Sequence, residues 1–294
     1  MPNLEIRLAQ PSDIPTIIDW AKNEDFAPGS GDVQIYRNTD KQGIWVAWVD
    51  SLAVGCIAGI KYNHIYGFIG LYIVKPEYRR NGYGHKLWEK ALAHLNNVQC
   101  IGLEAAPHLV DSYSEWGFKA SSQTIRWQLF KIDEINHTEQ LLNNHNFHVV
   151  TGNQIPLEVI NKYDAMREST ARPHFLSQWL KHQSGRVMTL IDNNNLCHGF
   201  ARIRPCFLTV GEGWRIGPIL ADSQQLAKIL ITNLLSQHQG IVLIDSPQNN
   251  TKAQALLFSL GFRQVSFTIR MYKGLCHHVV STKDVYGLAC LELG

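Results

Sequence analysis

The sequence feature that most constrains the fold is an internal repeat. The segment WGFKASSQTIRWQ, which begins at Trp116, and the segment LGFRQVSFTIRMY, which begins at Leu260, lie 144 residues apart and agree at six positions. The shared residues are Gly117 and Gly261, Phe118 and Phe262, Ser122 and Ser266, Thr124 and Thr268, Ile125 and Ile269, and Arg126 and Arg270. A repeat of this kind predicts that the chain contains two copies of one structural unit.

The pattern of apolar residues predicts the same order of elements in both copies. The first elements are two strands around a turn, residues 44–62 in the first copy and 187–204 in the second, and then a strand, 68–74 and 214–220. An amphipathic helix follows, 85–95 and 224–235, and then a strand, 100–105 and 241–246. Each copy ends with a helix that leads into Gly-Phe. We therefore predict an α/β (α+β) protein of two tandem units, each a twisted, mostly antiparallel sheet flanked by helices. Residues 1–130 form the first unit, 131–148 a polar connector and 149–294 the second.

Composition excludes several classes of function. The formal charge of the 294 residues is +2, from 27 basic and 25 acidic side chains, which argues against a nucleic-acid partner. There is no apolar run of 18 residues and no signal-peptide pattern, so we expect no membrane segment. The six cysteines lack a C-x-x-C pair and are expected to be buried thiols, and no metal site is expected. These features indicate a cytoplasmic protein.

The stretch VKPEYRRNGYGHKLW, residues 74–88, combines two arginines and two glycines between a predicted strand and a predicted helix. The first amide groups of a helix have no partner within the helix, and the helix dipole is positive at that end. Gly82 and Gly84 allow these amides to converge on an anion, and Arg79 and Arg80 add positive charge. Two other phosphate-binding patterns do not fit, because both fail at Leu87. The Walker pattern requires Ser or Thr at this position, after Lys86, and the dinucleotide-binding pattern requires its last glycine there.

The motif R-x-x-G-x-G, from Arg79 to Gly84, preceded by V-x-P at Val74, resembles the acetyl-CoA motif of the GNAT N-acetyltransferase superfamily. The resemblance implies that the backbone of the preceding strand lines the pantetheine arm and that the loop holds the pyrophosphate. The implied coenzyme-binding residues are Tyr72, Ile73, Val74, Arg79, Arg80, Asn81, Gly82, Tyr83 and Gly84. A basic surface turn that caps a helix is the alternative interpretation of the loop.

Two further residues match the family. The stretch SYSEWGF fits its Tyr-x-x-x-Gly-Phe helix end, which implies that Tyr113 protonates the departing thiolate of coenzyme A. Glu104 stands where many relatives have the carboxylate that deprotonates the amine, directly or through water; an outward-facing strand residue is the alternative, and His108 is a weaker substitute. Many relatives have an asparagine between these two positions, which this chain lacks, so Asp111 or a backbone group would replace that contact. Asp32, in a predicted loop, is a further candidate for substrate contact.

The second copy lacks the features of the coenzyme site. Its counterpart of the glycine loop is ADSQQ, residues 221–225, and Leu257 and Asp245 align with Tyr113 and Glu104. Its sequence resembles the C-terminal domain of tandem acetyltransferases, which implies a structural and substrate-shaping role.

The resemblance implies transfer of the acetyl group of acetyl-CoA, with no metal, to a primary amine of a small molecule or a peptide, with the small molecule favoured. The backbone amide near Ile73 would polarise the thioester carbonyl. Two alternatives remain: an acyl-CoA-binding regulatory module without catalysis, and an N-acyltransferase that uses another acyl-CoA.

Overall fold

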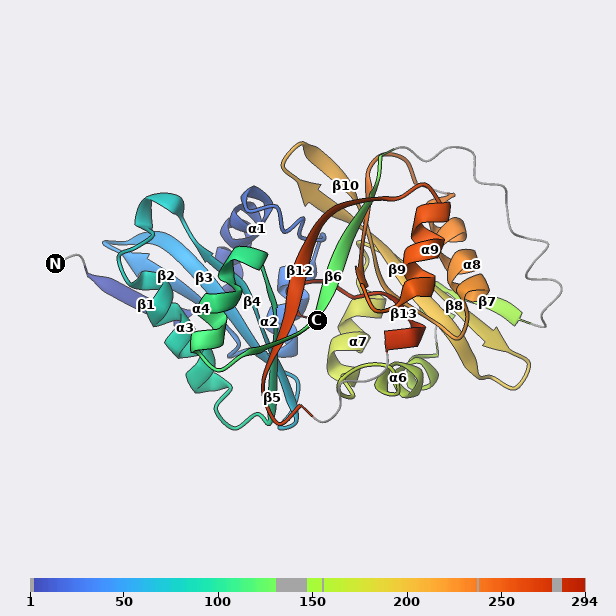
Figure 1. Cartoon of the computed structure of the whole chain (residues 1–294), viewed down its shortest axis with the longest axis horizontal. Coiled ribbons are helices and arrows are strands. Elements are labelled where there is room, and N and C mark those ends of the chain that lie inside the picture. The colour runs from blue at the N-terminus through green and yellow to red at the C-terminus, as the bar shows by residue number, and fades with distance from the viewer. Residues whose placement is uncertain (1–2, 131–146, 155, 237, 277–281, 294) are drawn as a thin grey trace.

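The computed structural model describes residues 3–130, 147–154, 156–236, 238–276 and 282–293, and Figure 1 shows two α/β units next to each other. The first unit contains β1 (Leu4–Leu8), α1 (Ile14–Asn23), α2 (Asp32–Thr39), β2 (Ile44–Val49), β3 (Leu52–Lys61), β4 (Tyr66–Val74), α3 (Tyr83–His94), β5 (Cys100–Ala105), α4 (Val110–Glu115) and β6 (Lys119–Leu129). The second contains β7 (Phe147–Thr151), α6 (Leu157–Ala165), α7 (Pro173–Lys181), β8 (Arg186–Asp192), β9 (Cys197–Leu208), β10 (Gly211–Ala221), α8 (Gln224–Leu235), β11 (Val242–Pro247), α9 (Thr251–Ser259), β12 (Arg263–Gly274) and β13 (Val285–Gly287).

The predicted fold class is confirmed: both units are mixed α/β, and their strands pair mostly antiparallel. The parallel pairs among the described strands are β4 with β5 and β10 with β11, which are equivalent positions in the repeat. Most of the predicted connector, residues 131–146, lies outside the described residues, whereas residues 147 and 148 begin strand β7, which pairs with β8.

The two units exchange their last long strands, which the sequence did not reveal. In the described part of the chain all thirteen strands belong to one sheet, in the order β1-β2-β3-β4-β5-β12-β6-β11-β10-β9-β8-β7, with β13 on β10. Strand β12 of the second unit therefore lies between β5 and β6, and β6 of the first unit lies between β12 and β11 (Figure 1). Each unit completes its sheet with a strand from the other.

The repeated segments meet at the centre of this exchange. Strands β6 and β12 are antiparallel, and Thr124 lies opposite Thr268, its own counterpart in the repeat. The two copies of the unit are therefore related by an approximate twofold axis that passes between these two threonines. The repeat that revealed the two units is also the segment that joins them.

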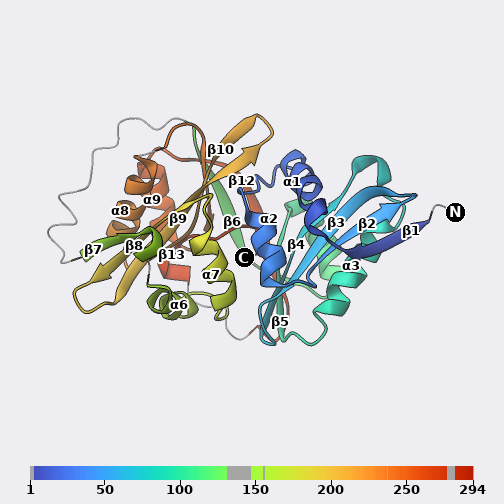
Figure 2. The same ribbon diagram turned by 180° about the vertical axis from the view of Figure 1, so that it is seen from behind.

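Helices cover both faces of the sheet. Helices α3 and α4 pack on one face of the first unit, and α8 and α9 pack on the second unit (Figure 1). On the other face, α1, α2 and α7 share one core with strands of both units (Figure 2). Phe175 and Trp179 of α7 are fully buried in that shared core. The units are thus joined by apolar packing as well as by the exchanged strands.

A buried ion pair also connects the units. Asp32, at the start of α2, accepts hydrogen bonds from Arg204 of β9, with Nε–Oδ1 and Nη2–Oδ2 distances of 2.8 Å. Both side chains are completely buried. The expectation that Asp32 contacts substrate is therefore wrong: its carboxylate is committed to balancing a buried guanidinium.

The prediction that all six cysteines are thiols is wrong for one pair. Cys100 and Cys276 form a disulfide across 176 residues of sequence. The strand exchange explains this pairing, because Gly274 of β12 lies opposite Cys100 of β5. Cys56, Cys197, Cys206 and Cys290 are buried thiols, as predicted. Since disulfides are uncommon in the cytosol, the cysteines no longer support a cytoplasmic location. Among the described residues, no helix is long and apolar enough to cross a membrane.

Candidate active site

The site begins where two parallel strands separate. Strands β4 and β5 pair from Tyr66↔Cys100 to Ile69↔Leu103, and beyond that point their pairing ends while β4 continues to Val74. A bulge in β4, with Leu71 at a positive φ of 47°, turns the strand at the same place. The backbone of Tyr72, Ile73 and Val74 therefore has no strand partner on its β5 side. This is the arrangement that lets an extended ligand lie along a strand.

The glycine loop leads from β4 into an uncapped helix. Gly82 is the N-cap residue of α3, with φ of 81°, and no side chain of the described residues caps the first amides. Asn81 shapes the loop, because its Nδ2 donates to the carbonyl oxygens of Tyr78 and Arg79 at 3.2 Å. Gly84 allows close packing against β4, since a Cβ at this position would lie 2.5 Å from the Tyr72 hydroxyl. The helix start at Gly82 therefore has the form that an anion site requires, and anion binding at residues 79–84 stays a prediction.

The two arginines of the loop have different surroundings. Arg79 donates from Nε to the carbonyl oxygen of Val74 at 2.8 Å, and its Nη2 pairs with Glu24. Arg80 is exposed, adopts a positive φ of 65°, and has no hydrogen bond or ion pair with the described residues. Arg80 is therefore the cation available to an anionic ligand, while Arg79 holds the loop to β4 and α1.

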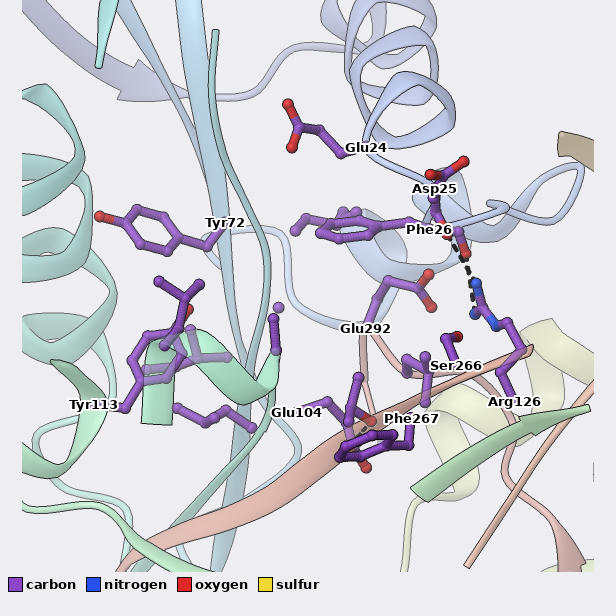
Figure 3. Close-up of a pocket in the computed structure, with 18 of the residues that line it drawn as sticks. Glu24, Asp25, Phe26, Tyr72, Glu104, Tyr113, Arg126, Ser266, Phe267 and Glu292 are labelled. Atoms are coloured by element: carbon purple, nitrogen blue, oxygen red, sulfur yellow. Dashed lines mark hydrogen bonds between the residues drawn. The ribbon is translucent and has the colours of Figure 1, made fainter. Parts of the chain in front are cut away.

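A cavity of about 280 Å³ lies in the opening between β4 and β5. The residues that line it are Glu24, Asp25, Phe26, Ile69, Gly70, Leu71, Tyr72, Trp88, Leu103, Glu104, Ala106, Leu109, Tyr113, Arg126, Ser266, Phe267, Thr268, Leu291 and Glu292. Figure 3 shows Tyr72 and Tyr113 on one side of the pocket and Arg126, Ser266 and Glu292 on the other. His108 and Asp111 are exposed and do not line it.

Tyr113 lies among aromatic side chains near the cradle. Its ring stacks on Trp88 with centroids 5.0 Å apart, and Trp88 packs in turn against Tyr72 at 5.5 Å. Burial, together with the neighbouring Tyr72, raises the pKa of the Tyr113 phenol well above its usual range. The phenol therefore keeps its proton at neutral and moderately alkaline pH, as a general acid must.

Glu104 lines the pocket, but its carboxylate already has partners. Oε1 accepts from Thr124 Oγ1 at 2.8 Å and from Arg270 Nε at 2.6 Å, and Oε2 accepts from Thr268 Oγ1 at 2.5 Å. Three donors from two strands therefore hold this carboxylate in place at the edge of the pocket. The interpretation of Glu104 as an outward-facing strand residue is wrong, because its side chain is only 3% exposed.

The second unit contains the matching ion pair. Asp245 of β11 lies opposite Arg126 of β6 and accepts from its Nε at 2.8 Å, as Glu104 of β5 lies opposite Arg270 of β12. Each repeated arginine thus pairs with a carboxylate of the other unit. The Asp245–Arg126 pair lies in the second unit's half of the sheet, which has no glycine loop, so an ion pair at this position does not depend on a coenzyme site. What both pairs share is that each joins an exchanged strand to its neighbour.

The groove of the second unit is closed in three ways. Strand β13 pairs with β10 where β10 separates from β11, with Ile219 opposite Gly287 and Leu220 opposite Val285. Ser223 caps the first turn of α8, since its Oγ accepts from the amide of Leu226 at 3.3 Å. Leu257 is fully buried at the position that aligns with Tyr113. In the described second unit, β13 and Leu257 therefore occupy this groove, and Ser223 caps one of the first amides of α8.

Sequence reasoning missed the side of the pocket opposite Tyr113. The residues there come from the α1–α2 loop (Asp25 and Phe26), from β12 (Ser266 and Phe267) and from the C-terminal segment (Leu291 and Glu292). Arg126 holds this loop by donating to the carbonyl oxygens of Asp25 and Phe26 at 2.8 and 3.3 Å. Acidic residues in the α1–α2 loop and the C-terminal segment were the available signal, but nothing in the sequence showed that these segments meet β12.

The described first unit thus combines a separated strand pair, a glycine-rich helix start next to it, and a pocket lined by Tyr72 and Tyr113. Residues 14–118 match the model of the acetyltransferase (GNAT) family, and residues 160–287 match an acetyltransferase (GNAT) domain model. The chain therefore belongs to the GNAT superfamily, with two domains in tandem. As in that family generally, it is an acyltransferase that uses an acyl-CoA and an amine acceptor.

Similar proteins extend over nearly the whole chain. The holothin acyltransferase of Pseudoalteromonas sp. (strain SANK 73390) is 29% identical over 278 residues, which cover 94% of this chain and 90% of that protein. The structure of a candidate acetyltransferase from Pyrococcus horikoshii has a TM-score of 0.79 at 22% identity, over 99% of this chain and 96% of that one. A tandem GNAT protein from the clavulanic acid biosynthesis pathway has a TM-score of 0.63 at 16% identity, over 92% and 98%. These two structures support the tandem fold.

Proposed function

We propose that the first unit transfers the acetyl group of acetyl-CoA directly to the primary amine of a small molecule. The proposal rests on one arrangement: the strand segment Tyr72 to Val74 is open on its β5 side, the glycine loop of residues 79 to 84 follows it, and Tyr72 and Tyr113 line the pocket beside it. The name of the Pseudoalteromonas relative gives holothin as its acceptor, which supports a small molecule over a peptide for this chain as well.

In this proposal each residue has one role. Amides at the start of α3 and Arg80 bind the pyrophosphate, while Arg79 and Asn81 keep the loop in shape. A backbone amide of β4 near Ile73 polarises the thioester carbonyl. The acceptor ammonium loses its proton to a water molecule held by Glu104, and the free amine attacks the carbonyl carbon. As the C–S bond breaks, Tyr113 donates its proton to the thiolate, the acylated nitrogen releases its second proton to water, and the Tyr113 phenolate is reprotonated from solvent.

We also propose that the division into units at residues 1–130 and 149–294 separates catalysis from support. The second unit contributes strand β12 and the C-terminal segment to the active pocket, and its own groove is filled. Its function in this proposal is to shape the acceptor side of the first unit's pocket.

A thiol-release assay tests the proposed function. Acetyl-CoA should stabilise the protein against thermal unfolding, because it binds the folded state alone. Free coenzyme A should then appear with one or more members of an amine panel. Absence of thermal stabilisation would contradict the coenzyme assignment. Stabilisation without thiol release from any amine would instead support the regulatory module, and a preference for longer acyl-CoA over acetyl-CoA would support the other acyltransferase.

Replacing Arg80 with Ala should weaken acetyl-CoA binding about tenfold, since a charge-assisted contact to phosphate contributes about 1.5–3 kcal/mol before solvent screening. The effect should shrink as ionic strength rises. Lys90→Ala is the matched control, because Lys90 is an exposed cation of α3 that lies farther from the glycine loop in the sequence. Titration calorimetry at two salt concentrations measures both variants. Equal dissociation constants for Arg80→Ala and the unmodified protein would show that this arginine does not contact the coenzyme.

A further inference from the structure

The C-terminal segment, residues 288–293, passes from the second unit into the pocket of the first. It follows β13, which fills the second unit's groove, and Leu288 donates its amide to the carbonyl oxygen of Asp245 at 2.8 Å. Its other end is fixed by Tyr62, whose hydroxyl donates to the carbonyl oxygen of Leu293 at 3.3 Å. Both family matches end at or before residue 287, so the comparisons assign no role to this segment.

The segment is packed closely against the pocket's own strand. A Cβ at Gly70 of β4 would lie 2.0 Å from the carbonyl oxygen of Glu292. Arg204 donates to the carbonyl oxygen of Ala289 at 3.1 Å, and Cys290 is fully buried. Residues of both units therefore hold the backbone around Glu292 in place. Its side chain extends from this backbone into the pocket (Figure 3).

The pocket lining is acidic. It contains the carboxylates of Glu24, Asp25, Glu104 and Glu292 and the guanidinium of Arg126. Arg126 is balanced by Asp245, which lies outside the lining. Glu24 is paired with Arg79, Glu104 with Arg270 and Glu292 with Arg215, so Asp25 is the lining carboxylate without an arginine partner among the described residues. An excess of negative charge in a concave site attracts a cation, and the protonated form of a primary amine is one.

Glu292 is the buried carboxylate of the pocket with the weakest existing contacts. Arg215 Nη1 lies 3.2 Å from Oε1 and 3.4 Å from Oε2, and the Tyr36 hydroxyl lies 3.4 Å from Oε2. The shortest side-chain bond of Arg215 goes instead to Asp245, at 2.7 Å. An ionised carboxylate can accept about four hydrogen bonds, so Glu292 has capacity for another donor.

We propose that Glu292 binds the ammonium group of the acceptor, so that the C-terminal segment of the second unit determines acceptor recognition by the first. Its side chain is only 3% exposed, and a cation that reaches it is held where solvent screens little. Glu292 lies across the pocket from Tyr113 (Figure 3), so an amine held there approaches the thioester from the side opposite the departing sulfur. The acceptor is therefore recognised as a cation, and proton removal follows binding.

This inference rests on the proposed function, and Glu292→Gln tests it separately. The variant should raise the KM for the acceptor at least tenfold, change kcat less, and leave acetyl-CoA affinity as it was. Glu89→Gln, on the exposed face of α3, is the matched control. An unchanged acceptor KM with normal acetyl-CoA turnover overturns the inference and leaves the proposed function intact. A larger effect from Asp25→Asn, the exposed carboxylate of the same pocket, also overturns it.

Charge recognition can be measured without an acylated product. Choline and 3,3-dimethylbutan-1-ol have the same shape and differ in one positive charge. As competitors of the acceptor, choline should bind the unmodified protein at least tenfold more tightly, and Glu292→Gln should remove that difference. If Glu292→Gln does not fold, Glu292→Asp keeps the charge beside Arg215 but withdraws the carboxylate, and it should reduce the preference for choline. Equal inhibition by both compounds in the unmodified protein overturns the inference.

Discussion

Tyr113→Phe should lower kcat for acetyl transfer by about 10²-fold or more, which is the usual contribution of a positioned general acid. The ring of phenylalanine preserves the stacking on Trp88, so the KM for acetyl-CoA should change little. Steady-state thiol release at saturating acceptor measures both parameters. Tyr286→Phe is the control, because it removes a phenol from β13 in the filled groove of the second unit.

The pH dependence of kcat provides a second readout for Tyr113. Its pKa is raised, so the phenol remains protonated as the pH rises through its ordinary value of about 10. We therefore expect no loss of kcat from ionisation of this tyrosine up to about pH 10. A kcat for Tyr113→Phe equal to that of the unmodified protein would show that the thiolate takes its proton from water.

Asp32→Asn should destabilise the protein by about 3–5 kcal/mol, because removal of one partner of a buried ion pair leaves the other charge uncompensated. Its partner Arg204 is fully buried and donates two hydrogen bonds of 2.8 Å to this carboxylate. Urea unfolding measures the free energy of unfolding, provided that the transition remains two-state. The pair joins α2 of the first unit to β9 of the second. Without it, the two units should unfold in two separate transitions rather than in one.

Two comparisons give this prediction its control. Glu77→Gln breaks an exposed pair with Lys75, and solvent screening should leave stability unchanged. Asp32→Asn combined with Arg204→Met removes the pair and should recover part of the loss, but not all of it, because the buried Arg202 also lies 3.9 Å from Asp32 and keeps its charge. Stability of Asp32→Asn equal to that of Glu77→Gln would mean that Arg204 finds another partner in the folded state.

The sequence predicted most of the elements and the coenzyme side of the site. Strand and helix patterns are local, and the glycine loop from Arg79 to Gly84 joins a strand to a helix in both the prediction and the structure. The acceptor side depends on contacts between distant segments. Glu292 approaches Gly70 only because the chain crosses between units after β13.

The strand exchange could not be predicted because each copy carries a complete set of strands. A sheet closed within one unit and a sheet completed by the other unit have the same apolar pattern in β6 and β12. The disulfide between Cys100 and Cys276 and the ion pair between Glu104 and Arg270 both follow from the exchange, so both were missed. The identity of Arg126 and Arg270 in the repeat was the one sign of their equivalent roles.

In the proposed function, one coenzyme site in the first unit serves the whole chain. Titration calorimetry with acetyl-CoA tests it most directly, because it counts sites as well as measuring affinity. We expect one acetyl-CoA per chain, because the helix start at Gly82 has no side-chain cap from the described residues and β13 occupies the matching groove of the second unit. A stoichiometry of two would contradict the filled second groove, and the absence of binding would contradict the cradle itself.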